Sequence, residues 1–458
     1  MMILRFAKYL LLLTFLITCV CSYFGMVTKK VRVRTISRIS QSRNRILSPE
    51  DCIAVYGQVQ NSDSSLHNLL VAAISHKFGK VEIVDYHQVY KSGYFSLYLP
   101  PGHYPMYVFA DINKDGLFES NECVGFYTDS PMLSVKKRKQ QRLLGPVILK
   151  VAENKVYDLD LPLSIKVNKM EKIVESKYYP AGTIRTLDDH IFSPDIAMLG
   201  VYEPASFLQR AGGYLYALEE LDTNKNPIIF VHGFGGTPRE FKYIAEKIDR
   251  SRYEPLFFYY PSGERLQMIA DIFYEIFLSQ RVFDMRKRSV VICAHSMGGL
   301  VARAAVNHYV SDNREEFLKA FISIATPYGG VESAAAGVQQ APVVIPAWRD
   351  VASGSAFLES LYKTKIPENI PFYLLFAFRS PKLLKTGENS DGTIGIRSQL
   401  FPAAQFSAKS VYGFDETHTG VLTSDKVIEV LNEILAGIEG PAYLSPETIN
   451  ADTVISNN

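Results

Sequence analysis

The stretch from Val290 to Leu300, VVICAHSMGGL, constrains the fold of this chain most. An apolar, β-branched run ends there in a turn centred on Ser296, and a helix-prone segment follows at once. A serine at such a strand–turn–helix junction has a strained backbone, and small residues two places to either side let strand and helix approach each other. Ala294 and Gly298 occupy those two places. The pattern predicts that Ser296 is a nucleophile held clear of a sheet.

A nucleophilic serine needs a base, an acid that orients the base, and hydrogen-bond donors for the oxyanion. Upstream, the apolar run 227–231 is followed by the glycine-rich HGFGGTP at 232–238. The N–H of Phe234 in this turn is expected to bind the oxyanion together with the N–H of Met297. His232 is a less favoured candidate for the base, because a histidine in this place more often braces the loop.

Two strand-like runs downstream each end in a loop with the required side chain. The first leads to Asp391 and the second to His418, in the chain order serine, acid, histidine. We expect Asp391 to orient His418, and His418 to take the proton of the serine. Asp415 and Glu416 are competing acids, because both lie close in sequence to the histidine.

Five motifs in this order resemble those of the α/β-hydrolase lipases and esterases, in particular bacterial lipases and the GPI inositol-deacylase-like branch. They are HGFGGTP, AHSMGGLVAR, ATPYGG, SDGTIGIRSQ and THTGVL, over about residues 200 to 440. The resemblance implies a mostly parallel sheet with helices on both faces. It also implies Ser296, Asp391 and His418 as a catalytic triad, Phe234 and Met297 as oxyanion donors, and no cofactor for catalysis. Ala294 and Tyr328 depart from the usual glycine and histidine of these motifs.

The pattern of the first fifty residues indicates a targeting segment. Residues 1–28 form a signal peptide, a lipoprotein signal or a membrane anchor, and 29–50 form a basic stem. Basic residues after an apolar stretch normally stay in the cytoplasm, which argues against export. We nevertheless expect an exported protein, anchored in the cell envelope or secreted, that lies near a membrane surface. The net charge of +2, from 49 basic and 47 acidic residues, excludes a nucleic-acid partner.

The pattern of residues 51–163 predicts a small all-β sandwich, because short runs of alternating apolar and polar residues are separated by turn residues. The segment resembles carboxypeptidase-regulatory or transthyretin-like domains. Cys52 and Cys123 are the two cysteines of this region that could form a disulfide, although spacing alone does not fix geometry.

A calcium-loop pattern lies inside the same region. Asp111, Asn113 and Asp115 alternate before Gly116, and Glu122 stands where a bidentate ligand closes such a loop. The pattern predicts a structural calcium site, although a strand precedes it where an EF-hand has a helix. An acidic surface turn is the alternative.

The remaining boundaries follow from composition. We expect a linker at 164–199, the hydrolase domain at 200–440 with a lid-like insertion at about 331–370, and a polar tail at 441–458. The expected activity is hydrolysis of carboxylic esters of lipids or other hydrophobic acyl compounds. Acyl transfer, thioester cleavage and amide cleavage would use the same triad, and a surface protein that only binds is the alternative from another class. The oligomeric state stays open.

Overall fold

The computed structural model describes most of the chain from residue 52 to residue 438. The described residues are 52–61, 66, 68–77, 80–89, 94–136, 143–151, 155–159, 164–166, 174–175, 183–211, 214–222, 224–279, 288–312, 317–379 and 389–438. The targeting segment, the basic stem and the polar tail lie outside them. Within these ranges, no helix combines the length and the apolar character needed to cross a membrane.

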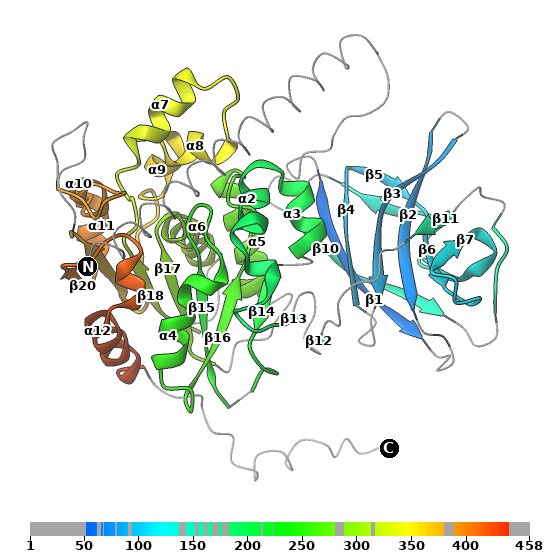
Figure 1. Ribbon diagram of the computed structural model, residues 1–458, viewed down its shortest axis with the longest axis horizontal. Helices are drawn as coiled ribbons and strands as arrows, with labels where there is room; N and C mark the ends of the chain where they lie inside the picture. Colours follow the sequence, from blue (N-terminus) through cyan, green and yellow to red (C-terminus); the bar gives the residue numbers. More distant parts are fainter. Residues whose placement is uncertain are drawn as a thin grey trace, which may run out of the picture.

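The larger domain is built on a nine-stranded sheet (Figure 1), in the order β12-β13-β14-β16-β15-β17-β18-β19-β20. All pairings from β16 to β20 are parallel, whereas β14 runs antiparallel to β16. The central strands are continuous apolar runs because helices cover both of their faces. The strands are β12 (Val174–Glu175), β13 (Thr183–Ile184), β14 (Leu215–Ala217), β15 (Asn226–Val231), β16 (Tyr253–Phe258), β17 (Val290–His295), β18 (Leu318–Ile324), β19 (Phe372–Ala377) and β20 (Ser410–Phe414).

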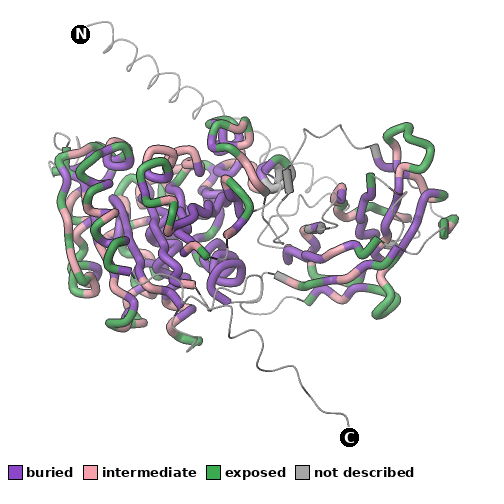
Figure 2. Tube along the Cα trace, turned by 90° about the horizontal axis from the view of Figure 1, so that it is seen from below, coloured by how far each residue is buried: buried purple, intermediate pink, exposed green. Residues whose placement is uncertain are grey.

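Helices alternate with these strands and enclose them. Figure 2 shows the buried centre of this domain inside a more exposed outer layer. The helices are α2 (Pro194–Tyr202), α3 (Pro204–Ala211), α4 (Lys242–Lys247), α5 (Leu266–Phe273), α6 (Met297–Ser311), α7 (Glu332–Gln340), α8 (Pro346–Val351), α9 (Ala356–Ser360), α10 (Ile396–Gln399), α11 (Pro402–Ser407) and α12 (Asp425–Ala436). Short 3-10 helices are η2 (Ser120–Glu122), η3 (His190–Phe192), η4 (Pro238–Phe241) and η6 (Gly420–Thr423), and the π-helix η5 (Tyr274–Leu278) continues α5.

This architecture is the expected α/β-hydrolase fold, a mostly parallel sheet with helices on both faces. The domain starts earlier than residue 200, however. Strand β13 at Thr183 already pairs with the sheet, and α2 begins at Pro194. The short strand β11 (Ser164–Lys166) pairs instead with β7 of the other domain. Part of the expected linker is therefore divided between the two domains.

The N-terminal region is rich in strands, as expected, but the two-sheet sandwich is not confirmed. Its main sheet has seven strands in the order β3-β2-β6-β8-β10-β1-β4. The two edge strands meet, because the Asp85 carboxylate on β3 accepts a hydrogen bond from Tyr98 N on β4 at 2.7 Å. One sheet therefore curls around the core. The strands are β1 (Ile53–Asn61), β2 (Leu69–Lys77), β3 (Lys80–Val89), β4 (Tyr94–Leu99), β5 (Gly102–Tyr104), β6 (Met106–Ala110), β7 (Leu117–Glu119), β8 (Cys123–Phe126), β9 (Leu133–Val135) and β10 (Leu143–Val151).

The two cysteines of this domain are not joined. Cys123 begins β8 and is fully buried, and its thiol donates to the carbonyl of Gly125 at 3.4 Å, whereas Cys52 lies just before β1. Burial raises the pKa of the Cys123 thiol to about 11, which keeps it protonated and unreactive. The suggested disulfide between Cys52 and Cys123 is therefore wrong.

The insertion at 331–370 is anchored through its second helix. Asp350 on α8 is buried, accepts the N–H of Leu266 at 2.7 Å and pairs with Arg265 at 2.7 Å. The N–H of Ala347 also binds the carbonyl of Gly263. Helix α7 is far less buried than this anchor, since its one buried residue is Ala334. Any lid motion would therefore involve α7 rather than α8.

This anchor gives the first testable prediction. Replacing Asp350 by alanine removes the acceptor of a buried N–H, so the free energy of unfolding should fall by about 1–3 kcal/mol. Urea denaturation of the purified variant measures the change. Glu359→Ala, at an exposed position of the same insertion, is the control and should leave the unfolding midpoint unchanged. Equal midpoints for the two variants would contradict the anchoring role.

Candidate active site

Ser296 lies at a sharp turn between β17 and α6. Its φ of +54° is in the left-handed region, which non-glycine residues rarely adopt. The turn is imposed by close packing behind it, because a Cβ on Gly298 would lie 2.4 Å from the carbonyl oxygens of both Val231 and His232. Only glycine fits there, and Ala294 on the other side is fully buried. The strained turn therefore directs Ser296 away from the sheet.

The structure brings the three expected side chains together. Nε2 of His418 lies 2.9 Å from the Oγ of Ser296, and Nδ1 of His418 lies 2.6 Å from an oxygen of Asp391. The serine follows β17, the aspartate lies in the loop after β19, and the histidine lies in the loop after β20. Because these strands are parallel, their carboxyl ends meet at one edge of the sheet. All three side chains are buried, so the hydrogen bonds form in a medium of low polarity.

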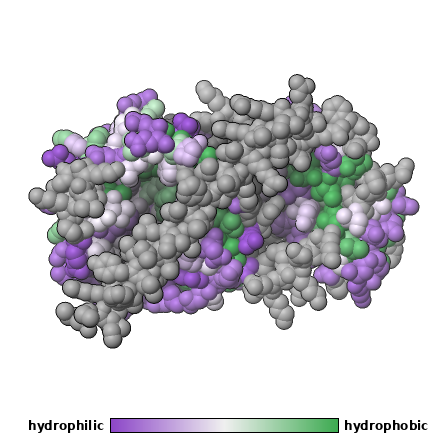
Figure 3. Space-filling view, turned by 45° about the horizontal axis from the view of Figure 1, so that its top comes forward, coloured by the Kyte–Doolittle hydropathy of each residue, from purple (hydrophilic) through white to green (hydrophobic). Residues whose placement is uncertain are grey.

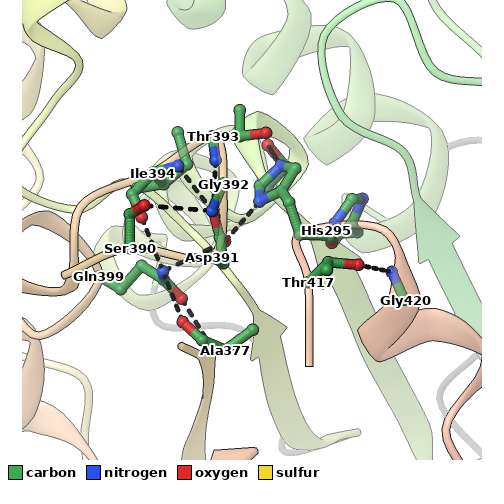
Figure 4. A network of polar contacts seen from close by, with 12 residues as sticks. His295, Ala377, Ser390, Asp391, Gly392, Thr393, Ile394, Gln399, Thr417 and Gly420 are labelled. Carbon is green, nitrogen blue, oxygen red and sulfur yellow. Dashed lines mark hydrogen bonds and ion pairs between the residues drawn. The ribbon is translucent and has the colours of Figure 1, made fainter. Parts of the chain in front are cut away.

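The Asp391 carboxylate is held by a set of donors (Figure 4). One oxygen accepts the N–H groups of Thr393 at 2.9 Å and Ile394 at 2.7 Å, and the other accepts both His418 and the side-chain amide of Gln399 at 3.2 Å. These donors fix the position of the carboxylate beside the imidazole. Asp391 can therefore stabilise a positive charge on the histidine.

Gln399 is a site residue that the sequence interpretation missed. Its buried amide also exchanges hydrogen bonds with both backbone groups of Ala377, the last residue of β19, at 3.0 Å each. It therefore ties the loop of the aspartate to the end of the sheet. The competing acids lie elsewhere, since Asp415 and Glu416 both pair with Arg379.

The surroundings of His418 favour its neutral form. Burial lowers the pKa of the imidazole below its ordinary value of 6.5, and the hydrogen bond to Asp391 opposes this only in part. A neutral imidazole whose Nδ1–H is bound to a carboxylate has its Nε2 lone pair free to accept a proton from Ser296. The histidine is therefore in the state that a general base requires.

His232 braces the glycine-rich loop, as the sequence analysis expected of a histidine in this place. Its Nδ1 is 2.8 Å from the carbonyl oxygen of Gly233, and its Nε2 accepts the N–H of Tyr260 at 3.3 Å. Burial lowers the pKa of His232 to about 4, so the ring is neutral and cannot carry charge at ordinary pH. Its ring also stacks on that of Tyr260, with centroids 4.3 Å apart. A catalytic role for His232 is therefore excluded by its contacts.

Most N–H groups of the glycine-rich loop already have hydrogen-bond acceptors within the protein. Gly233 donates to Glu240, Gly235 to Ser262 and Gly236 to the carbonyl of Gly233. In the described part of this loop, the N–H of Phe234 has no such acceptor. Met297 is the first residue of α6, where N–H groups lack partners inside the helix.

The sequence interpretation also missed Glu240 and His295, which lie near the site. Thr237-Pro238-Arg239-Glu240 resembles a capping box, in which the glutamate would bind the backbone at the helix start. Glu240 instead reaches the N–H of Gly233 and Nδ1 of His295, at 3.3 and 3.2 Å. No local pattern distinguishes this glutamate from a capping residue.

The expected calcium ligands lie in the loop between β6 and β7, in the other domain. Asp111, Asn113 and Asp115 accept N–H groups of the loop itself, and Glu122 accepts those of Ile112 and Asn113. Among the described residues, no three acidic, histidine or cysteine side chains converge closely enough to hold a metal ion. The loop is thus closed by hydrogen bonds, and calcium binding stays a prediction.

Residues 223–360 match a family model described as "Putative serine esterase (DUF676)". No curated protein has a sequence that matches the chain significantly.

Solved structures with a similar fold include two lipases and one gene product. The mature form of the Bacillus licheniformis lipase BlEst2 is 18% identical, with 48% of this chain and 98% of that chain covered and a TM-score of 0.38. The product of the gene lin2722 from Listeria innocua is 16% identical, with 47% and 96% covered and a TM-score of 0.35. Aspergillus fumigatus lipase B is 16% identical, with 53% and 59% covered and a TM-score of 0.38.

The family model spans the glycine-rich loop, the serine turn and part of the insertion, and it ends before Asp391 and His418. The strand order and the chain order of the three polar residues complete the pattern. The C-terminal domain thus has the α/β-hydrolase fold, and residues 223–360 within it match the putative serine esterase family model.

Proposed function

We propose that this protein hydrolyses carboxylic esters with hydrophobic acyl groups through an acyl-enzyme on Ser296. The observation that carries the proposal is the continuous hydrogen-bonded chain from Ser296 through His418 to Asp391. His418 takes the proton of the serine as Oγ attacks the ester carbonyl, and then returns it to the leaving alcohol. A water molecule resolves the acyl-enzyme by the same two proton transfers. Asp391 stabilises the imidazolium that forms in each half of the reaction.

The negative oxygen of each tetrahedral intermediate needs donors that are already in place. The N–H groups of Phe234 and Met297 suit this role, because one lies in the loop over the serine and the other begins α6. The closeness of the loop is seen at Gly233, where a Cβ would lie 3.3 Å from the Oγ of Ser296. Removing one such donor typically lowers kcat about 100- to 1000-fold.

Exposed apolar side chains near the carboxyl edge of the sheet, where Ser296 lies, favour a hydrophobic substrate. Phe234 follows β15 and is 41% exposed, and Phe378 follows β19 and is 39% exposed. Phe401, beside Gly329 in the loop after β18, is also exposed. Large apolar side chains that gather at one edge mark a binding surface more often than a plain solvent surface.

Export and membrane attachment belong to the same proposal. Residues 1–28 would supply the signal or anchor and 29–50 a basic stem, and a membrane surface would then present lipid esters to the site. The strand-rich end of the molecule also carries apolar surface residues (Figure 3), and its exposed apolar side chains include Phe126, Met132 and Val156. A structural calcium ion in the loop of Asp111 would stiffen that domain and take no part in the reaction.

Labelling with a fluorophosphonate tests the nucleophile. The purified protein should be labelled and should turn over p-nitrophenyl esters, with longer acyl chains preferred over acetate. Ser296→Ala should abolish labelling and lower turnover by roughly 10⁴-fold or more, because the acyl-enzyme cannot form. Ser353→Ala, at an exposed position, is the matched control and should behave like the parent. Labelling that persists in Ser296→Ala would place the nucleophile elsewhere.

Crowding at the glycine-rich loop gives a second prediction. In Gly233→Ala the new Cβ would lie 2.9 Å from the Cβ of Ser296, so the serine or the loop must move. Since a displacement of about 1 Å can cost roughly 100-fold in rate, kcat for a p-nitrophenyl ester should fall by at least 10-fold. Gly437→Ala is the control, because its Cβ would make only ordinary contacts. An unchanged kcat in Gly233→Ala would contradict the proposed position of the loop.

The pH dependence follows from the state of His418. The general base must be neutral, so activity falls as the pH drops through its pKa. Burial lowers that pKa below 6.5, and kcat/KM should therefore hold at pH 6.5 and fall only in more acidic buffer. Initial rates between pH 4 and pH 9 give the profile. A half-maximal point at neutral pH or above would show that Asp391 outweighs burial.

A further inference from the structure

His295, the residue before the nucleophile, has a hydrogen-bond acceptor at each ring nitrogen. Nδ1 is 3.2 Å from a carboxylate oxygen of Glu240, and Nε2 is 2.9 Å from the backbone oxygen of His418. A neutral imidazole has only one N–H to donate, whereas the protonated ring has two. With an ionised Glu240, both hydrogen bonds can therefore form together only if His295 carries two protons, and the carboxylate supplies the matching negative charge.

Glu240 connects this ring to the oxyanion loop. The same oxygen that faces His295 also accepts the N–H of Gly233 at 3.3 Å. The other oxygen lies against Gly236, where a Cβ would be only 2.4 Å away. Burial raises the pKa of the Glu240 carboxyl, whereas the hydrogen bond and the charge of His295 lower it. The lowering is the larger effect, so the net shift of the pKa is downward. The carboxylate is thus ionised beneath the loop.

We propose that Glu240 and His295 form a charged positioning pair that holds the oxyanion loop and the catalytic histidine in register with the nucleophile. The inference rests on the proposed ester hydrolysis. Neither residue touches the reacting atoms. The pair instead joins the three backbone segments of the site, because Glu240 holds Gly233, His295 directly precedes Ser296, and its Nε2–H holds the carbonyl of His418.

The pair also acts on His418 through its charge. The rings of His295 and His418 have centroids 4.9 Å apart, so a positive His295 disfavours a second positive charge on His418. The other ionisable groups that face His418 are Asp391 and Glu240, and both favour its protonation. Glu240 acts through His295 and is also faced by the neutral His232. If Glu240 loses its charge, His295 releases a proton, and His418 becomes easier to protonate because the lost effect of His295 is larger than the lost effect of Glu240.

Glu240→Gln in the purified full-length protein tests this pair. The amide keeps the size of the side chain and can still accept from Gly233, but it carries no charge. We expect kcat for a p-nitrophenyl ester to fall roughly 10- to 100-fold with KM within about twofold, because the loop and the base lose their register. The acid limb of kcat/KM should move to higher pH, since His418 loses its positive neighbour.

Two further variants separate positioning from plain stability. Glu240→Asp keeps the charge, so its acid limb should return toward that of the parent even if kcat stays low. Glu246→Gln, the same change at an exposed position on α4, should match the parent in every measurement. A fall in kcat accompanied by a lower melting temperature and an unmoved acid limb would overturn the proposal, and so would an unchanged kcat.

A spectroscopic measurement decides the protonation state without using activity. Two-bond ¹H–¹⁵N spectra of ring-labelled Ser296→Ala protein should show His295 protonated on both nitrogens near neutral pH. His295→Gln assigns the signal, and Glu240→Gln should convert it to the neutral form. A singly protonated His295 in the otherwise unchanged protein would overturn the charged pair. A protein that hydrolyses no ester but shows this signal would contradict the proposed function and leave the pair supported.

Discussion

The close approach of α6 to the end of β15 is the contact on which this active site depends. At Gly298 the helix backbone packs directly on the carbonyl groups of Val231 and His232, with no space for a side chain. This packing forces Ser296 to a positive φ, a strain of about 1–3 kcal/mol that the fully buried strands around it must offset. The same contact brings the glycine-rich loop over the serine. This one contact therefore places both Ser296 and the backbone N–H groups that we propose as oxyanion donors.

The sequence predicted the residues whose position follows from the order of elements in the chain. Ser296, Asp391 and His418 each lie in the turn or loop that follows a strand-like run, and a parallel sheet brings the carboxyl ends of its strands to one edge. The sharp turn was predicted from the small residues around the serine. The same logic predicted the alternation of strands and helices, because central strands and amphipathic helices have different apolar periods.

The supporting residues could not be predicted, because their roles arise from contacts distant in sequence. Gln399 lies on a short helix, and only the folded chain shows its amide between Asp391 and the end of β19. Glu240 fits a helix cap by its spacing, yet it binds His295, which is 55 positions away. In the strand-rich domain, alternation predicted the strands correctly but could not tell two sheets from one curled sheet. That choice depends on the contact between Asp85 and Tyr98 at the two edges.

The sheet order explains why the strand-rich domain does not obstruct the catalytic edge. Ala54 and Tyr56 on β1 belong to the same buried cluster as Tyr214, which lies just before β14. Tyr98 on β4 also packs against this cluster and faces the phenol of Tyr214. Figure 1 shows β4 and β10 beside α3, on the side of the hydrolase domain away from β20. Because β14 and β20 lie on opposite sides of β17 in the sheet, the domain docks on the flank away from the catalytic histidine. The edge that carries the serine, the aspartate and the histidine is therefore left for the substrate.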